Sequence, residues 1–192
     1  MKPLIESDRM KITKENKLVI IINGKGESGK DTLINHLKNQ SIISNISSID
    51  PIKKIAYENG WNGKKDDKAR LFLSNLKKAF TEFNDLPNQY INKETKRFLI
   101  TSKKIMFVHI REPENISSYI NFLNRNSIEY ITLLVKRNRV DSKKFGNNAD
   151  DLVDNFHYDY IFYNEWDLER SSKAFTKLVE NIYTSKISNK NS

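Results

Sequence analysis

The feature that most constrains the fold is a run of five aliphatic residues, Leu18 to Ile22, which leads into a glycine-containing segment. A continuous apolar run without polar alternation is typical of a strand that is buried on both faces. Strands of this kind occur in parallel sheets that carry helices on each side. The sequence therefore predicts an α/β fold with a parallel, doubly covered sheet.

Strand-like and helix-like patterns alternate along the rest of the chain. We expect strands at 17–23, 46–49, 104–110, 129–135 and 158–163, and helices at 31–39, 66–84, 89–100 and 168–182, with further helices starting at Asp50-Pro51 and Pro113. This alternation predicts βαβ units and a mainly parallel five-stranded sheet between two helical layers. The apolar stripe of 66–84, which includes Phe72, Phe80 and Phe83, is interpreted as core.

A chain of 192 residues is expected to form one domain. We interpret residues 1–16 as an N-terminal arm, 17–184 as the domain and 185–192 as a polar tail that frays. Residues 136–151 are polar and contain Gly146, which favours a loop.

Composition excludes several kinds of chemistry. Cysteine is absent, which rules out disulfides, thiol catalysis and thiolate metal sites, and the three histidines form no zinc motif. The aliphatic run is too short to cross a bilayer, and the first residues carry no secretion-signal pattern. We therefore expect a soluble, cytoplasmic protein without a membrane partner. A net charge of +9 is compatible with phosphate-bearing partners but does not distinguish a nucleotide from a nucleic acid.

A phosphate-binding loop follows the first strand. Residues Gly24-Lys25-Gly26-Glu27-Ser28-Gly29-Lys30 satisfy the pattern G-x-x-x-x-G-K between a strand and a helix. Glycines let backbone N–H groups point at the phosphates of a nucleotide, and the following helix start favours negative charge. We expect this loop to bind ATP, with Lys30 bridging the β- and γ-phosphates.

The residue after the lysine departs from the usual pattern. Asp31 stands where Ser or Thr is common, and Thr32 follows it. A carboxylate suits Mg²⁺, which would also reduce its repulsion from the phosphates. Asp31 and Thr32 are both candidates to handle Mg²⁺, and the pattern does not choose between them.

Three segments together resemble a known family. They are the loop with Gly29-Lys30-Asp31-Thr32, the segment from Gly60-Trp61-Asn62-Gly63 to Leu76, and His109-Ile110-Arg111. These features resemble the bacteriophage deoxynucleoside monophosphate kinases of the nucleoside monophosphate kinase superfamily, and the order of elements agrees from Lys17 to about Ile182. The resemblance implies a three-layer P-loop NTPase fold with a helical acceptor-binding insertion at about 60–100 and a short lid at about 136–151. It also implies transfer of a phosphoryl group from Mg-ATP to a nucleoside monophosphate or a similar acceptor.

The resemblance also assigns residues. It implies catalytic roles for Lys30, Arg111, Arg137 and Arg139, with Arg137 and Arg139 in the lid over ATP, and an acceptor site that includes Asp50, Arg70 and Arg111. His109 occupies the place of the family's Asp, so Glu112 and Asp50 are candidates for that position's role. Residues 164–167 are assigned to the base. An acceptor phosphate is already a nucleophile at neutral pH, so a catalytic base is not required.

Two other functions are compatible with the sequence. One is a kinase for another small phosphorylated metabolite, and the other is a P-loop ATPase or nucleotide-binding module associated with nucleic acid. The basic residues are dispersed without interleaved aromatics, so nucleic-acid binding is not expected. The identity of the acceptor and the oligomeric state, a homodimer included, stay open.

Overall fold

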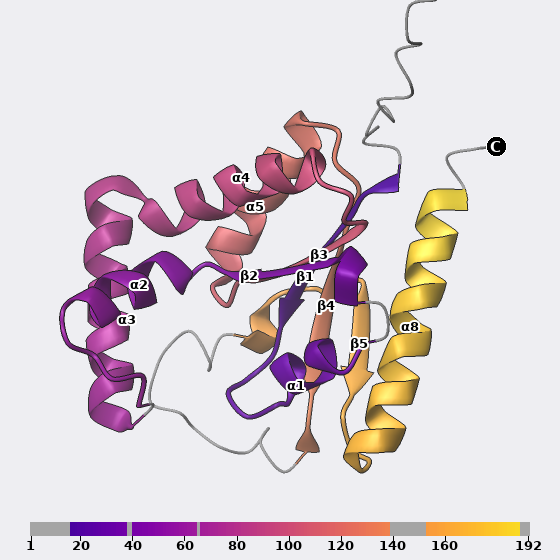
Figure 1. Cartoon of the computed structure of the whole chain (residues 1–192), viewed down its shortest axis with the longest axis horizontal. Helices are drawn as coiled ribbons and strands as arrows, with labels where there is room; N and C mark the ends of the chain where they lie inside the picture. The colour runs from indigo at the N-terminus through magenta and orange to yellow at the C-terminus, as the bar shows by residue number, and fades with distance from the viewer. Residues whose placement is uncertain (1–15, 38–39, 65, 139–152, 189–192) are drawn as a thin grey trace, which may run out of the picture.

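The computed structural model describes residues 16–37, 40–64, 66–138 and 153–188. Its centre is a five-stranded sheet in the order β2-β3-β1-β4-β5, in which every pairing is parallel (Figure 1). The strands are β1 (Leu18–Asn23), β2 (Ile43–Ser47), β3 (Ile105–His109), β4 (Tyr130–Lys136) and β5 (Tyr160–Tyr163). The predicted α/β fold with a parallel five-stranded sheet is confirmed.

The first strand occupies the centre of the sheet. All six residues of β1 are buried, as expected for a continuous apolar run with neighbours on both edges and both faces. Ile22 pairs with His109 of β3, and Asn23 pairs with Leu134 of β4. The segments that follow β1, β3 and β4 therefore emerge side by side at the carboxyl ends of these parallel strands.

Helices cover both faces of the sheet, which gives three layers (Figure 1). The side chains of Leu18, Ile20 and Ile22 lie on one face of the sheet and pack in one core cluster with α1 (Lys30–Asn35) and α8 (Leu168–Ser188). The alternate residues Val19 and Ile21 pack in a second cluster with α4 (Leu86–Leu99) and α5 (Pro113–Arg125). No helix among the described residues is long and apolar enough to cross a membrane.

A smaller helical unit extends from one side of the sheet. It consists of α2 (Asp50–Glu58) and α3 (Asp67–Asn84), which share a third apolar cluster around Ile52, Ala56 and Leu73. Within the range of about 60–100, for which we predict a helical acceptor-binding insertion, the structure has α3 and α4. The remaining elements are two short 3-10 helices, η2 (Gln40–Ile42) and η3 (Val153–Asn155).

The prediction that the whole aromatic stripe of α3 is core is wrong. Phe72 is 45% exposed and Phe83 is 81% exposed, whereas Phe80 packs partly against the third cluster. Leu73 is the one residue of this helix that is buried. The helical spacing identified an apolar face correctly, but α3 packs mainly against α2 and α4, and the part of the face that carries Phe72 and Phe83 meets solvent.

Several predicted boundaries also shift. α1 ends at Asn35 instead of 39, and β2 begins at Ile43 and ends before Ile49. α4 starts at Leu86 because Pro87 fits the first turn, where its missing N–H is not needed. α8 continues to Ser188, so the expected tail from 185 begins as helix.

The expected lid and arm fall mostly outside the described residues. Lys136, the first residue of the predicted lid, is the last residue of β4 and pairs with Tyr163. Arg139, the rest of the lid to 151, and the arm at 1–15 are not described.

Candidate active site

The glycine loop follows the carboxyl end of β1, beside the carboxyl ends of β3 and β4. Gly29 has φ +86°, a left-handed conformation that glycine adopts at little cost. A Cβ on Gly29 would lie 2.4 Å from Asn164 Nδ2, and one on Gly24 would lie 2.4 Å from the carbonyl oxygen of Val135. The loop thus forms a tight backbone cradle in which side chains do not fit at these two positions.

Lys30 reaches back across this cradle from the start of α1. Its side chain is buried, with 8% of the residue exposed. Its Nζ donates to the carbonyl oxygen of Gly24 at 2.8 Å and lies 3.3 Å from that of Lys25. The ammonium is therefore held against the loop itself, where phosphate oxygens would meet it.

The segment after β5 braces the loop from the other side. The Nδ2 of Asn164 donates to the carbonyl oxygen of Ser28 at 2.8 Å, and the backbone N–H of Asn164 donates to Lys136 at 2.8 Å. Arg137 follows β4, and its NH1 lies 3.9 Å from the Cβ position of Gly29. The predicted Arg137 is thereby brought beside the loop, whereas Asn164 contacts the loop backbone.

His109 lies at the end of β3, with charged groups on several sides. Its pKa is lowered to about 4, mainly by burial and also by the charges of Lys30, Lys53 and Arg111, while the charge of Asp31 acts in the opposite direction. A ring with this pKa is neutral at pH 7. Its Nε2 is 2.8 Å from Asn45 Oδ1, and its Nδ1 is 3.5 Å from Asp31 Oδ1. The structure therefore brings Lys30, Asp31 and Arg111 together around one neutral imidazole.

Asp50 lies at the start of α2. Its Oδ2 accepts a hydrogen bond from the backbone N–H of Ser47 at 2.7 Å, so it closes the turn that precedes the helix. Burial raises the pKa of Asp50, and the backbone hydrogen bond and the Lys53 charge act against this. Burial and the charge of Asp50 both raise the pKa of Tyr90 on α4. Tyr90 is a neighbour of Asp50 that the sequence patterns did not identify.

Glu112, the other candidate for the role of the missing Asp, is engaged elsewhere. Its Oε1 lies 2.5 Å from Lys77 Nζ of α3, and Asn115 Nδ2 donates to its Oε2 at 3.3 Å. Burial would raise the pKa of Glu112, but the charge and hydrogen bond of Lys77 outweigh it and hold the pKa below its usual value. The ionised carboxylate thus joins α5 to α3.

An ion-pair group lies beside the loop at the start of η3. Asp154 Oδ1 is 2.8 Å from Lys136 Nζ, and its Oδ2 is 3.7 Å from Lys25 Nζ. Nearby, Asn23 Nδ2 donates to the hydroxyl of Tyr158 at 2.7 Å. Asp154 is a further residue that motif reasoning missed, because its partners lie far away in sequence.

The predicted metal and acceptor residues differ in placement. Asp31 and Thr32 are exposed in the first turn of α1, and Arg70 is exposed near the start of α3. Among the described residues, no group of three or more His, Cys, Asp or Glu could hold a metal ion. Nucleotide-bound Mg²⁺ keeps phosphate and water oxygens and needs only one or two protein ligands. The exposed Asp31 carboxylate and Thr32 hydroxyl are oxygen donors that fit this requirement.

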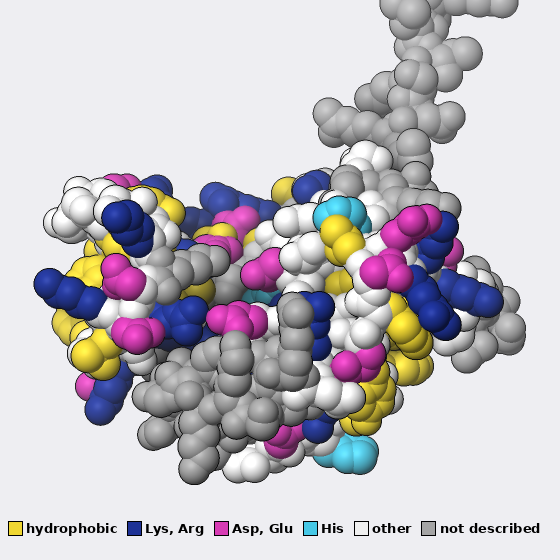
Figure 2. Space-filling model, turned by 90° about the horizontal axis from the view of Figure 1, so that it is seen from below, with side chains coloured by type: hydrophobic (Ala, Val, Ile, Leu, Met, Phe, Trp, Pro, Cys, Tyr) yellow, Lys and Arg dark blue, Asp and Glu magenta, His cyan; other side chains and the backbone are white. Residues whose placement is uncertain are grey.

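The surface at this edge of the sheet carries both signs of charge. Figure 2 views the molecule from below Figure 1 and shows Asp and Glu side chains interspersed with Lys and Arg side chains. A continuous basic stripe, which binding along a nucleic-acid backbone would favour, is not evident among the side chains drawn in colour on this face.

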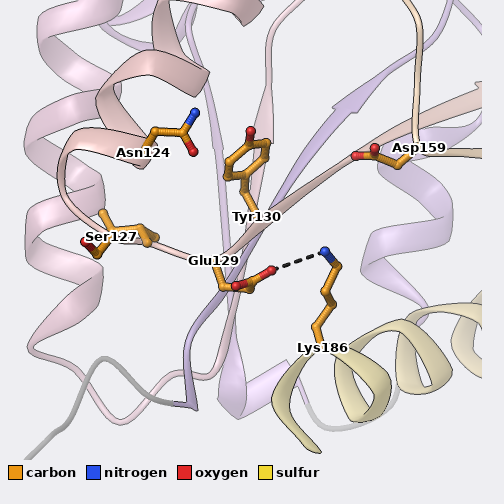
Figure 3. Close-up of a pocket in the computed structure, with 7 residues that line it drawn as sticks. Asn124, Ser127, Glu129, Tyr130, Asp159 and Lys186 are labelled. Carbon is orange, nitrogen blue, oxygen red and sulfur yellow. Dashed lines mark ion pairs between the residues drawn. The ribbon is translucent and has the colours of Figure 1, made fainter. Parts of the chain in front are cut away.

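A cavity of about 420 Å³ lies at the opposite edge, where β4 begins. Figure 3 shows its lining, in which Lys186 of α8 forms an ion pair with Glu129 at 3.2 Å. Asp159, also in the lining, accepts hydrogen bonds from the backbone and hydroxyl of Thr132. Ligands of open α/β sheets bind at the carboxyl ends of the strands, so the glycine-loop edge is the stronger candidate.

Comparison with known proteins identifies the fold. No protein-family model and no curated protein matches the sequence. A crystal structure of a proposed kinase from Chloroflexus aurantiacus aligns with 89% of this chain and 98% of its own, at 13% identity and a TM-score of 0.53. The structure of APE1195 aligns with 88% of this chain and 98% of its own, at 11% identity and a TM-score of 0.50. The APS kinase CysC of Mycobacterium tuberculosis, in complex with AMPPNP and APS, aligns with 86% and 98%, at 9% identity and a TM-score of 0.48.

These similarities concern the fold. The parallel sheet, the helices on both of its faces and the loop after β1 are those of the P-loop kinase α/β fold. At these identities, the chemistry has to be argued from the residues of this chain.

Proposed function

We propose that this chain transfers the γ-phosphoryl group of Mg-ATP to a (deoxy)nucleoside monophosphate. The observation that carries the proposal is the buried ammonium of Lys30, held against the Gly24 and Lys25 carbonyls of the glycine loop. Phosphoryl transfer depends mainly on positioning and on positive charge around the transferred group. Lys30 supplies such a charge at the loop that would bind the phosphates.

Two arginines flank the loop from neighbouring strands. Arg137 after β4 lies beside Gly29, and Arg111 after β3 lies near His109 and Lys30. A guanidinium binds phosphate oxygens with two parallel hydrogen bonds. We assign Arg137, which lies beside the glycine loop, to ATP, and Arg111, which lies near His109 after β3, to the acceptor.

The acceptor would occupy the side of the loop that faces α2 and α4. Arg111 and Lys53 provide cations there, and Asp50 and Tyr90 provide hydrogen-bonding groups. Arg70 of the neighbouring α3 is the further residue that we assign to the acceptor phosphate. This assignment of charges suits an acceptor that carries a phosphate.

The reaction needs no catalytic base. An oxygen of the acceptor phosphate attacks the γ-phosphorus, the bond to the β–γ bridging oxygen breaks, and ADP leaves with the electron pair. Mg²⁺, with Asp31 and Thr32 as its candidate protein ligands, would neutralise charge on the β- and γ-phosphates. Lys30 stabilises the charge that develops between the attacking and leaving oxygens.

The test is ADP release from Mg-ATP with each ribo- and deoxyribonucleoside monophosphate and without acceptor. We expect turnover that requires an acceptor, and a loss of about 100-fold or more in Lys30→Ala. Lys54→Ala, an exposed lysine on α2, is the matched control and should keep wild-type turnover. Equal turnover with and without acceptor would contradict a kinase and indicate an ATPase. ATP binding without turnover on any of these acceptors would contradict the nucleoside monophosphate and direct the search to other phosphorylated metabolites.

A further inference from the structure

The imidazole of His109 and the carboxylate of Asp31 face each other at the mouth of the loop. The Nδ1 of His109 lies 3.5 Å from Oδ1 of Asp31. This distance exceeds the 2.7–3.2 Å range of N–H···O hydrogen bonds, so the two groups are neighbours without a hydrogen bond between them.

The other ring nitrogen defines the tautomer of His109. Its Nε2 lies 2.8 Å from Oδ1 of Asn45, and an amide oxygen can only accept. Nε2 therefore carries the hydrogen, and in the neutral ring the lone pair is on Nδ1. Asn45 lies on β2, whose pairing with β3 is set by the sheet register, so the ring orientation is built into the fold.

This arrangement leaves two electron-pair donors 3.5 Å apart. The Nδ1 lone pair and the Asp31 carboxylate would repel unless a positive group lies between them. Divalent cations bind imidazole nitrogen and carboxylate oxygen at about 2.0–2.2 Å, so adjacent ligands on one ion are about 3 to 3.5 Å apart. The separation of these two atoms matches that of two ligands on a shared cation.

We propose that His109 Nδ1 and Asp31 are a mixed nitrogen–oxygen pair that binds the divalent cation of the nucleotide complex. The proposal rests on the proposed function, since phosphate oxygens and water would complete the coordination. Asn45 is a positioning residue here: metal-binding histidines generally donate their second N–H to an oxygen, which orients the ring and fixes its tautomer. The matching Asn45 contact is the second, independent feature of the site.

A nitrogen ligand changes which ion the site prefers. Mg²⁺ favours oxygen ligands, whereas imidazole suits transition metals, and affinity for N/O sites rises from Mn²⁺ towards Co²⁺. We therefore expect the nucleotide complex of this chain to bind Mn²⁺ and Co²⁺ more tightly than Mg²⁺, and to lose that preference when the imidazole is replaced.

The direct test is pulsed electron paramagnetic resonance of Mn²⁺ bound with the methylene analogue of ATP, which places no bridging nitrogen next to the ion. We expect a nitrogen coupling that changes from the ¹⁴N to the ¹⁵N pattern when histidine alone is ¹⁵N-labelled. This comparison uses the wild-type chain, so it does not depend on whether a variant folds. Bound Mn²⁺ without a histidine nitrogen coupling would overturn the proposal.

Variants then identify the histidine. His109→Gln should abolish the coupling and weaken Mn²⁺ binding by about tenfold or more, with a smaller effect on Mg²⁺. His36 is an exposed histidine at the end of α1, and His36→Gln should keep the nitrogen coupling and the Mn²⁺ affinity of the wild type. A coupling that survives in His109→Gln would also overturn the proposal. Failure of the analogue and Mn²⁺ to bind at all would instead contradict the proposed function, so the two failures are distinguishable.

Discussion

At the scale of single residues, Gly29 combines two constraints that an added methyl group would violate. Its φ is +86°, and a Cβ would lie 2.4 Å from Asn164 Nδ2, the group that braces the loop. We expect Gly29→Ala to lose about 1–2 kcal/mol of stability from the backbone alone and to weaken ATP binding by about tenfold or more. Denaturant unfolding and calorimetric titration with ATP measure the two effects.

Gly60 provides the matched control. Its φ is +91°, but nothing lies within 4 Å of its Cβ position. Gly60→Ala should therefore show the backbone cost with unchanged ATP affinity. If both variants bound ATP as the wild type does, the loop would not be the nucleotide site.

Arg111 and Arg137 should differ in which substrate they affect. Arg111 lies near His109 at the end of β3, and Arg137 lies beside Gly29 of the loop. We expect Arg111→Ala to raise KM for the acceptor by about tenfold with little change for ATP, and Arg137→Ala to do the reverse. Steady-state kinetics with each substrate varied in turn measure the split. The same KM defect in both variants would refute the separate assignments.

The sequence revealed the site residues that belong to a local motif and missed those that act across the fold. Gly24, Gly29 and Lys30 follow from spacing within seven residues, because one backbone turn determines their roles. Asn45 contacts the site from β2, and the sheet register that places it is not visible in any local pattern. Asn164 lies in the segment that the resemblance assigned to the base, but its contact with the loop backbone was not predicted.

At the scale of elements, an ion pair joins α3 to α5. Lys77 Nζ lies 2.5 Å from Glu112 Oε1, and both side chains are largely buried. Lys77→Met would leave the Glu112 carboxylate buried without this partner. We expect a loss of about 2–3 kcal/mol at pH 7, whereas Lys78→Met, next to it on the same helix and paired only at the surface with Glu82, should cost below about 0.5 kcal/mol. Urea unfolding measures both.

The pH dependence of the stability lost in Lys77→Met tests whether the charge of Lys77 is its cause. Lys77 holds the pKa of Glu112 below its usual 4.5, so the pair contributes stability above that pH and loses it as the pH falls through the lowered pKa. In Lys77→Met, burial, the largest cause, is opposed only by the hydrogen bonds from Asn115 and the backbone. We therefore expect the pKa of Glu112 to rise, so the variant gains stability relative to its pH 7 value as Glu112 is protonated. The difference between wild type and variant should therefore narrow from pH 7 to about pH 4. A constant difference would show that lost packing, not charge, is responsible.

Whether each segment forms a strand or a helix was predictable from the sequence, but which of its side chains are buried was less predictable. Apolar runs and helical periodicity identified the five strands and six α-helices of the described residues, apart from their ends. The exposure of Phe72 and Phe83 was missed because periodicity defines a face without saying which neighbour covers it. The helix expected at 89–100 begins earlier, at Leu86, because Pro87, a residue that can end or restart a helix, here occupies the first turn.

At the scale of the whole molecule, the apolar interior is divided unequally. Two large clusters cover the faces of the sheet, while α2 and α3 share a small one around Ile52, Ala56 and Leu73. Regions with few buried apolar contacts open locally without unfolding the rest. The helical unit that we assign to the acceptor is thus expected to be the less stable part, which is where substrate-driven movement is commonly found.

Hydrogen exchange under native conditions measures this division. We expect amides of α3 to exchange with an opening free energy at least about 2 kcal/mol below that of β1, whose six residues are all buried. Leu73→Ala should speed exchange in α3 by about tenfold or more and leave β1 protected, because it truncates the one buried side chain of that helix. Leu71→Ala, at a mostly exposed position of the same helix, should change neither. Equal opening free energies in α3 and β1 would mean that the chain unfolds as one unit, and any movement of the acceptor-side helices would then require a different physical origin.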